Sequence, residues 1–187
     1  MATSLPQTSS LIKAIWLDIR AGITRIGEHN RCRLWQAATA GRLAVCARCA
    51  ADLPPNRCDL ATLRYRDALD AVVAPFAYEF PITTLVQAMK FRHDPGAASA
   101  LAILVAAALA AAPPAPPQVL LPGPLHPWRL VRRGYNPSVV IARELGRAFS
   151  IALAVGPARR VRRTAPQSTL AVAGRGENLA QAFRVHA

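Results

Sequence analysis

Apolar residues recur at helical spacing in two separate stretches of the chain. In residues 10–27 they lie three or four positions apart, which predicts an amphipathic helix that docks on the rest of the chain. The same pattern recurs in residues 81–91, where Pro81 suits the first position of a helix. The apolar positions of this second stretch are Ile82, Leu85, Val86 and Met89.

Two further helices are predicted downstream. Residues 97–112 are apolar and rich in alanine, but the run is short for a membrane span and prolines follow it. We therefore expect a buried or half-buried helix there, and no membrane span. In residues 137–149, Ile141, Leu145 and Phe149 lie on one face of a predicted helix.

Strand-like segments alternate with these helices. Residues 70–80, "DAVVAPFAYEF", and residues 119–125, "VLLPGPL", are short apolar runs that predict strands. Residues 161–185 predict a basic loop, a short helix and the start of another strand. Strands that alternate with helices indicate the α/β class, with a mostly parallel sheet.

The chain divides into three predicted parts. Residues 1–29 hold the amphipathic helix, residues 30–66 form a cysteine-rich module like a zinc ribbon, and residues 67–187 form the α/β domain. Little apolar periodicity is present in the cysteine-rich part. We expect a metal to help such a module to fold, because it has little core of its own.

Four cysteines lie in this module with the spacing C-x13-C-x2-C-x8-C: Cys32, Cys46, Cys49 and Cys58. A C-x2-C turn can place two thiolates on one metal ion, and two more complete a tetrahedral zinc site. The alternatives are four free thiols, a disulfide pair or a redox-active C-x2-C pair. Because residues 1–10 lack the basic start of an export signal, we expect a reducing, cytoplasmic location.

The positive charge is concentrated in the last third of the chain. The formal net charge is +13 and the isoelectric point is about 11.3, which favours an anionic partner such as nucleic acid, phosphates or an acidic surface. Residues 129–187 contain 11 basic and 2 acidic residues. An arginine-rich composition that merely makes the surface basic is the alternative, since only two residues are lysines.

One stretch combines these charges with a predicted helix start: "PGPLHPWRLVRRGYNPS", residues 122–138. In an open α/β sheet, ligands bind beyond the carboxyl ends of the strands, where this stretch is expected to lie. Gly134 relaxes the backbone, Asn136 can cap the next helix, and Pro137 fits its first turn. Exposed amides at a helix start attract anions, and arginines add charge-assisted hydrogen bonds. The stretch therefore predicts a phosphate or pyrophosphate site; the alternative is a basic surface loop before a capped helix.

These residues resemble the ComF/GntX family of phosphoribosyltransferase-like proteins. "LLPGPLHPWRLVRRGYNPS" is similar to the family's "PVPLH…R…RGFNQ" stretch, and "RRTAPQSTLAVAGRGENLAQAFRV" to its "R.T..Q..L…R..N…AF" segment. "ITTLVQAMKFRHD" and the cysteine-rich head also have counterparts there. The resemblance covers about residues 30–185. It implies a type I phosphoribosyltransferase fold that binds phosphoribosyl pyrophosphate with magnesium, in a family linked to DNA uptake in natural competence or to gluconate utilisation.

The resemblance also implies roles for particular residues. The pyrophosphate side of the site would be formed by His126, Arg129, Arg132, Arg133, Gly134 and Asn136. A flexible loop that folds over the substrate would contain Arg163, Thr164, Gln167 and Arg175. Lys90 would lie near the site, although an ordinary solvated helix end explains it equally well.

The sequence departs from the family pattern at several points. The family's "DDVxTTG" loop holds the ribose hydroxyls and the 5′-phosphate, and the 187 residues contain no acidic pair followed by threonine and glycine. We therefore expect a domain that is shortened at its C-terminus and binds phosphate without turnover, and we assign no catalytic residue. Pro137 replaces a frequent glutamine, while Trp35 and Ala61 stand where the family has further cysteines.

Three functional interpretations follow from these observations. The first is an enzyme-like protein that binds or transfers a phosphoribosyl group. The second is a non-enzymatic competence accessory whose basic face meets single-stranded DNA or competence proteins, with binding that weakens steeply as salt rises. The third is a shortened gene product without activity of its own.

Overall fold

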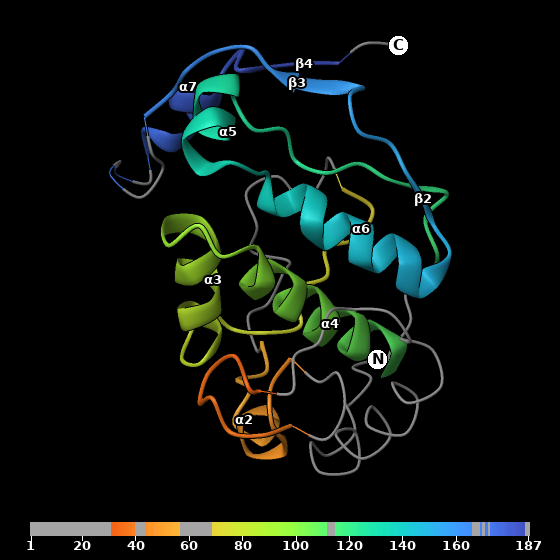
Figure 1. Cartoon of the computed structure of the whole chain (residues 1–187). Coiled ribbons are helices and arrows are strands. Elements are labelled where there is room, and N and C mark those ends of the chain that lie inside the picture. Colours follow the sequence, from red (N-terminus) through yellow and green to blue (C-terminus); the bar gives the residue numbers. More distant parts are fainter. Residues whose placement is uncertain are drawn as a thin grey trace.

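The computed structural model describes residues 31–39, 44–56, 69–111, 115–165, 169, 171 and 173–185. The helix predicted over residues 10–27 and the candidate ligand Cys58 lie outside these described residues. In chain order the helices are α2 (Ala47–Ala51), α3 (Ile82–Phe91), α4 (Pro95–Ala111), α5 (Pro127–Arg133), α6 (Pro137–Phe149) and α7 (Arg175–Leu179). The strands are β1 (Val119–Leu120), β2 (Ala152–Leu153), β3 (Ala158–Arg160) and β4 (Phe183–Val185). The chain is thus a mixed helix and strand protein (Figure 1).

The helix predictions are confirmed for the described part of the chain. Helix α3 begins one residue after the predicted start, because Pro81 is the residue that precedes its first turn. Helix α4 begins at Pro95, and the Asp94 carboxylate accepts a hydrogen bond from the Ala97 amide at 3.2 Å, which satisfies one free N–H of its first turn. Helix α6 has the predicted limits. Within the described residues, no helix combines the length and the apolar character that crossing a membrane requires.

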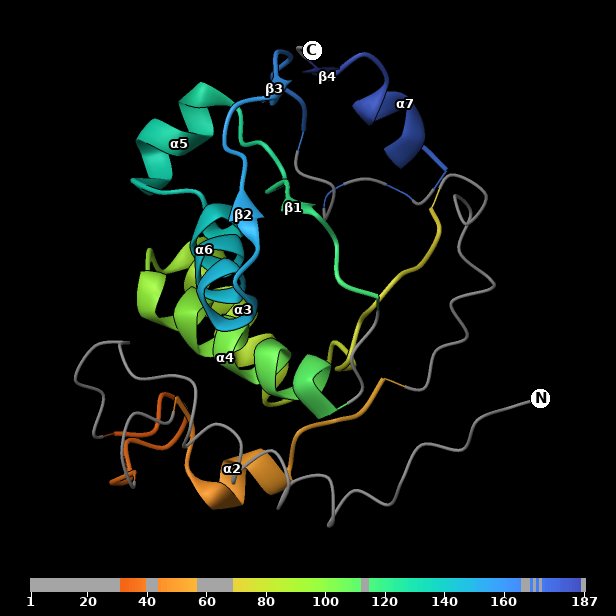
Figure 2. The same cartoon turned by 90° about the vertical axis from the view of Figure 1, so that its right-hand side faces the viewer.

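The core forms around the alanine-rich helix α4. Its alanines let α3 and α6 approach closely, and both helices pack on it (Figures 1 and 2). The cysteine-rich head shares this core, because Cys32, Ala44, Val45 and Ala50 belong to the same buried cluster as the α3 and α4 side chains. The proposed domain limits at residues 29 and 66 stay a prediction.

The strand predictions are only partly right. Residues 70–80 form no strand; they are extended and make one antiparallel bridge, between Phe76 and Pro55. The amide of Asn56 donates to the Pro75 carbonyl and that of Ala77 to the Pro54 carbonyl. Proline has no N–H group to donate, so the prolines on both segments prevent the bridge from growing into a ladder.

The strand predicted over residues 119–125 is also shorter than expected. Only Val119 and Leu120 pair, in parallel with Ala152 and Leu153 of β2. Pro122 and Pro124 follow β1, and Gly156 and Pro157 follow β2, so neither strand can extend its hydrogen bonds.

The sheet is therefore smaller than predicted. In place of one mostly parallel sheet, the described residues form the parallel β1–β2 pair and an antiparallel pair, in which β3 lies beside β4. Helix α6 packs on both α4 and β2 and so places the parallel pair on the helical core.

Candidate functional site

A short helix that the sequence analysis did not predict carries most of the basic residues nominated for anion binding. The sequence analysis placed no helix between the strand of residues 119–125 and the helix of residues 137–149, yet α5 forms there. The His126 ring accepts a hydrogen bond from the Trp128 amide at 3.2 Å, Pro127 occupies the first turn, and Gly134 ends the helix with a φ of +79°. That left-handed conformation suits glycine. Proline near the start and glycine after the end were the available signal for this helix.

Hydrogen bonds of Tyr135 and Asn136 fix the segment between α5 and α6. The Asn136 side chain accepts from the Ser138 amide at 3.1 Å and donates to the Gly123 carbonyl at 3.0 Å. The expected capping role of Asn136 is thus confirmed. The Tyr135 hydroxyl donates to the Met89 carbonyl at 2.6 Å, which ties this segment to the last turn of α3. Burial is the main cause that raises the pKa of Tyr135, so the hydroxyl stays a donor.

Two groups of nominated residues come together at Thr164. Arg129, from the predicted pyrophosphate group, donates from Nη2 to the Thr164 carbonyl at 2.7 Å. Arg160 of β3 donates to the hydroxyl of the same threonine. Thr164 belongs to the predicted flexible loop, so the structure brings that loop against α5. We call Arg129, Arg160 and Thr164 the arginine–threonine cluster.

No carboxylate among the described residues forms an ion pair with the arginines of this cluster. Among the described residues, the ion pairs are Arg33 with Asp94 and Arg147 with Glu144, both away from Thr164. Burial lowers the pKa of Arg160, and the nearby charge of Arg129 lowers it further. Burial also lowers the pKa of Arg133, partly offset by Tyr135 and reinforced by Arg129. Burial is thus the main cause of both shifts and repulsion by Arg129 adds to it, and an anion placed here would stabilise the charged guanidinium groups.

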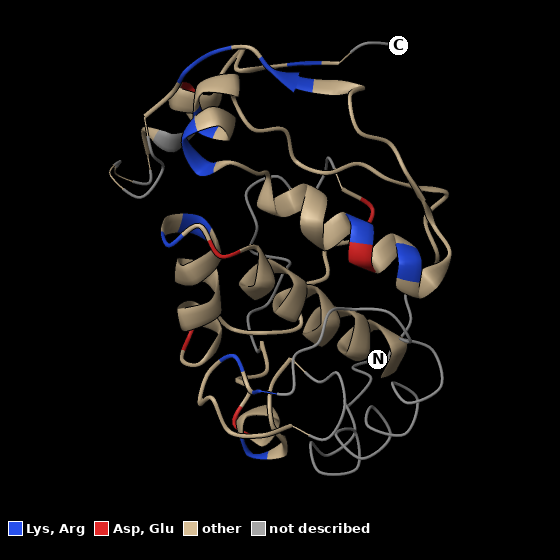
Figure 3. Ribbon diagram, in the orientation of Figure 1, with Lys and Arg blue, Asp and Glu red and all other residues tan. Residues whose placement is uncertain are grey.

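Two other nominated arginines lie near the ring of Trp128. The Arg163 guanidinium lies 4.0 Å from the centre of its ring and that of Arg132 lies 5.5 Å away, both within cation–π range. The indole is still 42% exposed. Arginines gather at this end of the molecule, over α5 and β3 (Figure 3). An exposed aromatic ring in a basic surface can stack with a planar ligand.

The other nominated residues are not part of the arginine–threonine cluster. Lys90 is exposed in the last turn of α3, next to Met89. Gln167 lies outside the described residues, and Arg175 is the first residue of α7. The segment after β3 is tied to α7, because Arg162 donates to the carbonyls of Glu177 and Asn178. Ligand contacts by any of the nominated residues stay a prediction.

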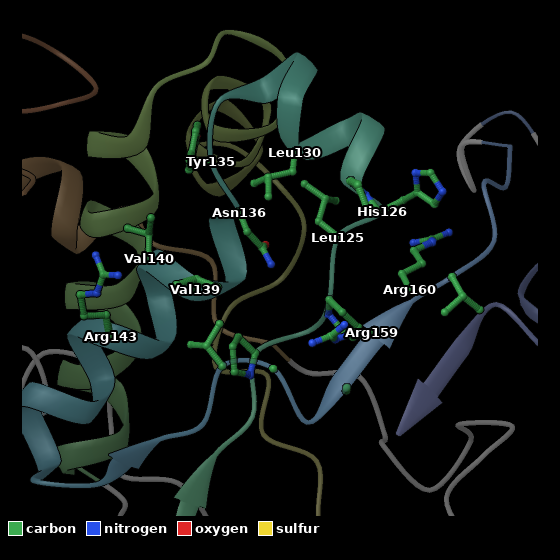
Figure 4. Close-up of a pocket in the computed structure, with 17 residues that line it drawn as sticks. Leu125, His126, Leu130, Tyr135, Asn136, Val139, Val140, Arg143, Arg159 and Arg160 are labelled. Atoms are coloured by element: carbon green, nitrogen blue, oxygen red, sulfur yellow. The ribbon is translucent and has the colours of Figure 1, made fainter. Parts of the chain in front are cut away.

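A cavity of about 620 Å³ opens beyond the carboxyl ends of the parallel strands. Its lining comes mostly from the segment of residues 122–127 after β1, from the segment of residues 155–161 after β2, and from α6 (Figure 4). This is where ligands bind in α/β sheets. The basic residues of its lining are His126, Arg143, Arg159 and Arg160, and the lining contains no acidic residue.

Three of these basic residues were missed by sequence reasoning: Arg143, Arg159 and Arg160. The basic run from 159 to 163 follows the Gly156–Pro157 turn, and this was the available signal. The predicted basic loop begins only at residue 161, and the strand β3 before it was not predicted. Arg160 thus belongs to both the cavity and the arginine–threonine cluster.

Three of the four candidate zinc ligands converge in the head. The sulfur atoms of Cys32, Cys46 and Cys49 all lie within 4.8 Å of one another, and those of Cys32 and Cys49 are 3.7 Å apart. Two sulfurs on one tetrahedral zinc ion, with Zn–S bonds of about 2.3 Å, lie about 3.8 Å apart. The three cysteines can therefore bind one metal ion, and the spacing is compatible with zinc.

The surroundings of Cys32 favour its thiolate form, which is the form that binds a metal ion. Burial acts to raise the pKa of Cys32, but hydrogen bonds with the backbone of Cys46, Leu34 and Trp35 outweigh it, so its pKa is lowered. Burial raises the pKa of Cys49 to about 12, reinforced by its sulfur neighbours. Three negative sulfurs in one place repel one another, and a cation relieves that repulsion.

The head is connected to the helical core beside this cluster. Arg33 forms an ion pair with Asp94 at 3.4 Å, and the same Asp94 caps α4. A side chain on Gly96 would collide with the Arg33 guanidinium, so glycine leaves the space that this arginine fills. The cysteine cluster and the start of α4 are thus parts of one packed unit.

A curated relative supports the resemblance that the motifs indicated. The chain is 30% identical over 125 residues to competence protein F of Haemophilus influenzae. This alignment covers 65% of the chain and 55% of that protein, so the chain spans little more than half of its relative. No family model and no solved structure matches the chain, and the phosphoribosyltransferase-type fold stays a prediction. The similarity to competence protein F confirms the resemblance to the ComF family and supports the membership of this chain in it.

Proposed function

We propose that this chain is a competence-associated ComF-family protein that binds a phosphate-bearing ligand at the arginine–threonine cluster. One observation carries the proposal: Arg129 and Arg160 both contact Thr164, and no carboxylate among the described residues forms an ion pair with them. Guanidinium groups form strong, directional hydrogen bonds with phosphate oxygens. The adjoining cavity beyond β1 and β2 provides room for the rest of a ligand.

The family resemblance makes phosphoribosyl pyrophosphate with magnesium the first ligand to examine. Turnover is not part of the proposal. The 187 residues contain no acidic pair followed by threonine and glycine, which would hold the ribose and the 5′-phosphate in that family.

Pyrophosphate is expected to protect the chain against heat through this cluster. At a concentration of about 100 times the dissociation constant, a ligand adds about 2.7 kcal/mol of stability, which raises the melting temperature by roughly 5–10 °C. The double substitution Arg129→Ala, Arg160→Ala is expected to abolish this ligand-induced shift, measured by differential scanning calorimetry.

A matched control removes the same number of charges elsewhere. Arg92 and Arg147 are exposed, at the end of α3 and on α6, and Arg147 forms only a surface ion pair. The Arg92→Ala, Arg147→Ala variant should keep the full shift with pyrophosphate. An equal shift in both double variants would mean that general charge attraction, and not the cluster, binds the anion.

We also propose that the three clustered cysteines bind zinc. The spacing of their sulfur atoms supports this proposal, as does the position of Cys32 in the shared core. The sequence nominates Cys58 as the fourth ligand. Zinc would supply structural stabilisation to a head that has few apolar residues of its own.

A second candidate function is the binding of single-stranded DNA across the same end of the molecule. Trp128 with its two arginines favours it, because a base can stack on the exposed indole while guanidinium groups contact phosphates. Phe183 offers a second exposed ring, with Arg160 at 5.3 Å from its centre.

The Trp128→Ala substitution is expected to weaken the binding of a labelled oligo-dT strand by about tenfold, since stacking contributes about 1–3 kcal/mol per base. Fluorescence anisotropy at constant salt measures this. Trp35 provides the matched control, because it is an exposed tryptophan in the cysteine-rich head. If Trp35→Ala weakens binding as much as Trp128→Ala does, the α5 surface is not the binding site.

A further inference from the structure

The cavity beyond the parallel strands is larger than a phosphate group requires. Its volume of about 620 Å³ lies within the range of about 300–1,000 Å³ that sites for small organic molecules have. An inorganic phosphate or pyrophosphate held by Arg160 would fill only the part of this space near β3. The rest of the cavity therefore needs another explanation.

The walls of the cavity differ in their chemistry. Figure 4 shows His126, Arg159 and Arg160 on the β3 side, while Val139 and Val140 of α6 lie across from them. The apolar side chains of the lining are Leu125, Leu130, Val139, Val140, Val155 and Val161. A ligand that carried only charge would leave this apolar surface in contact with water.

Arg160 connects the cavity with the arginine–threonine cluster. This residue lines the cavity and also contacts Thr164 in the arginine–threonine cluster. Its Nε atom is buried and has no hydrogen-bond partner among the described residues. A phosphate near Arg160 would therefore hold the remainder of its molecule inside the cavity.

We infer that the ligand of this cavity is an organic phosphate whose remaining part is apolar or aromatic. The phosphate binds Arg160 and Arg129, and the apolar part lies against Leu130, Val155 and the valines of α6. This inference rests on the proposed phosphate binding and adds the chemical class of the ligand. Burial of the apolar part provides the affinity that an inorganic anion cannot gain, because it removes apolar surface from water on both partners.

Phenyl phosphate and inorganic phosphate are the two probes that test the inference. Their dissociation constants from the 187-residue chain are measured by isothermal titration calorimetry at the same pH and ionic strength. We expect phenyl phosphate to bind at least about tenfold more tightly, as burial of a ring predicts. Methyl phosphate, which has the same charged group and almost no apolar part, should bind like inorganic phosphate.

Two exposed residues of the lining allow the wall to be changed without disturbing the core. Leu130 on α5 and Val155 after β2 are both exposed. The Leu130→Ser, Val155→Ser variant is expected to lose the preference for phenyl phosphate and to keep its affinity for inorganic phosphate. Val131→Ser is the matched control, since Val131 is on the same helix, is 84% exposed and is absent from the lining.

The outcomes separate this inference from the proposal beneath it. Equal affinities for phenyl and inorganic phosphate would overturn the inference and leave the proposed phosphate binding intact. No binding of either probe would overturn both. A preference for phenyl phosphate that survives the double serine substitution would overturn the placement of the apolar part in this cavity.

Discussion

Replacement of Cys32 by serine is expected to remove zinc from the chain and to lower its melting temperature by about 10 °C or more. Cys32 is fully buried, its sulfur lies 3.7 Å from that of Cys49, and it belongs to the core cluster that also contains Leu85. Serine keeps the size of the side chain but is a poor zinc ligand at neutral pH. Loss of the metal should therefore loosen both the head and its packing on α3 and α4.

Two measurements check this expectation. Metal analysis of the purified chain gives the zinc content, expected to be one ion per chain before the substitution and none after it. A strong chelator should lower the melting temperature of the unchanged chain to that of the Cys32→Ser variant, and should have no further effect on the variant. Ala47→Ser adds a hydroxyl to the exposed face of α2 and should keep the zinc. Full zinc content in the Cys32→Ser variant would contradict the proposed site.

The helices of this fold could be predicted from the sequence, and the reason lies in local spacing. Helix α6 has the predicted limits because Asn136 and Pro137 fix its start and its apolar positions repeat every three or four residues. Such signals are contained within one segment. The missed helix α5 had start and end signals too, but at seven residues it is too short to show an apolar repeat.

The strands could not be predicted as well, because pairing depends on a partner elsewhere in the chain. The run from 119 to 125 is apolar enough for a strand, but only its first two residues pair. The two residues that they pair with, Ala152 and Leu153, were not recognised as a strand. In β3, the residues Arg159 and Arg160 gave a basic run, which is typical of loops, and the pairing with β4 overrides this local preference.

The candidate site could be predicted only in part, because contacts between distant segments depend on the fold. Motif resemblance nominated Arg129 and Thr164 separately, and their contact depends on how β3 and α5 lie in space. Arg160 belonged to neither motif, so only the structure reveals it as their common neighbour. In the head, the C-x2-C spacing brought Cys46 and Cys49 together in sequence, while the approach of Cys32 depends on the fold of residues between them.

A Leu85→Ala substitution is expected to lower the free energy of unfolding by about 2–5 kcal/mol. Leu85 is 2% exposed on α3, between the alanine-rich helix α4 and the cysteine-rich head. Five of the twelve other buried side chains in its core cluster are alanines, which have little volume to move into the space left behind. A cavity that cannot collapse gives a cost near the upper end of this range. Because small proteins have about 5–15 kcal/mol in total, the change is a large share of the stability.

Urea unfolding followed by circular dichroism measures this loss, and the chain offers a control with the same chemical change. Leu69 is exposed, so Leu69→Ala should change the free energy of unfolding by less than about 0.5 kcal/mol. Leu85→Met keeps the volume and should cost less than about 1.5 kcal/mol. If Leu85→Ala were as mild as Leu69→Ala, the head and helices α3 and α4 would not share the packed core described above. A large loss for alanine and a small one for methionine would instead identify the volume of Leu85 as a main contribution to the core that the cysteine-rich head shares with α3 and α4.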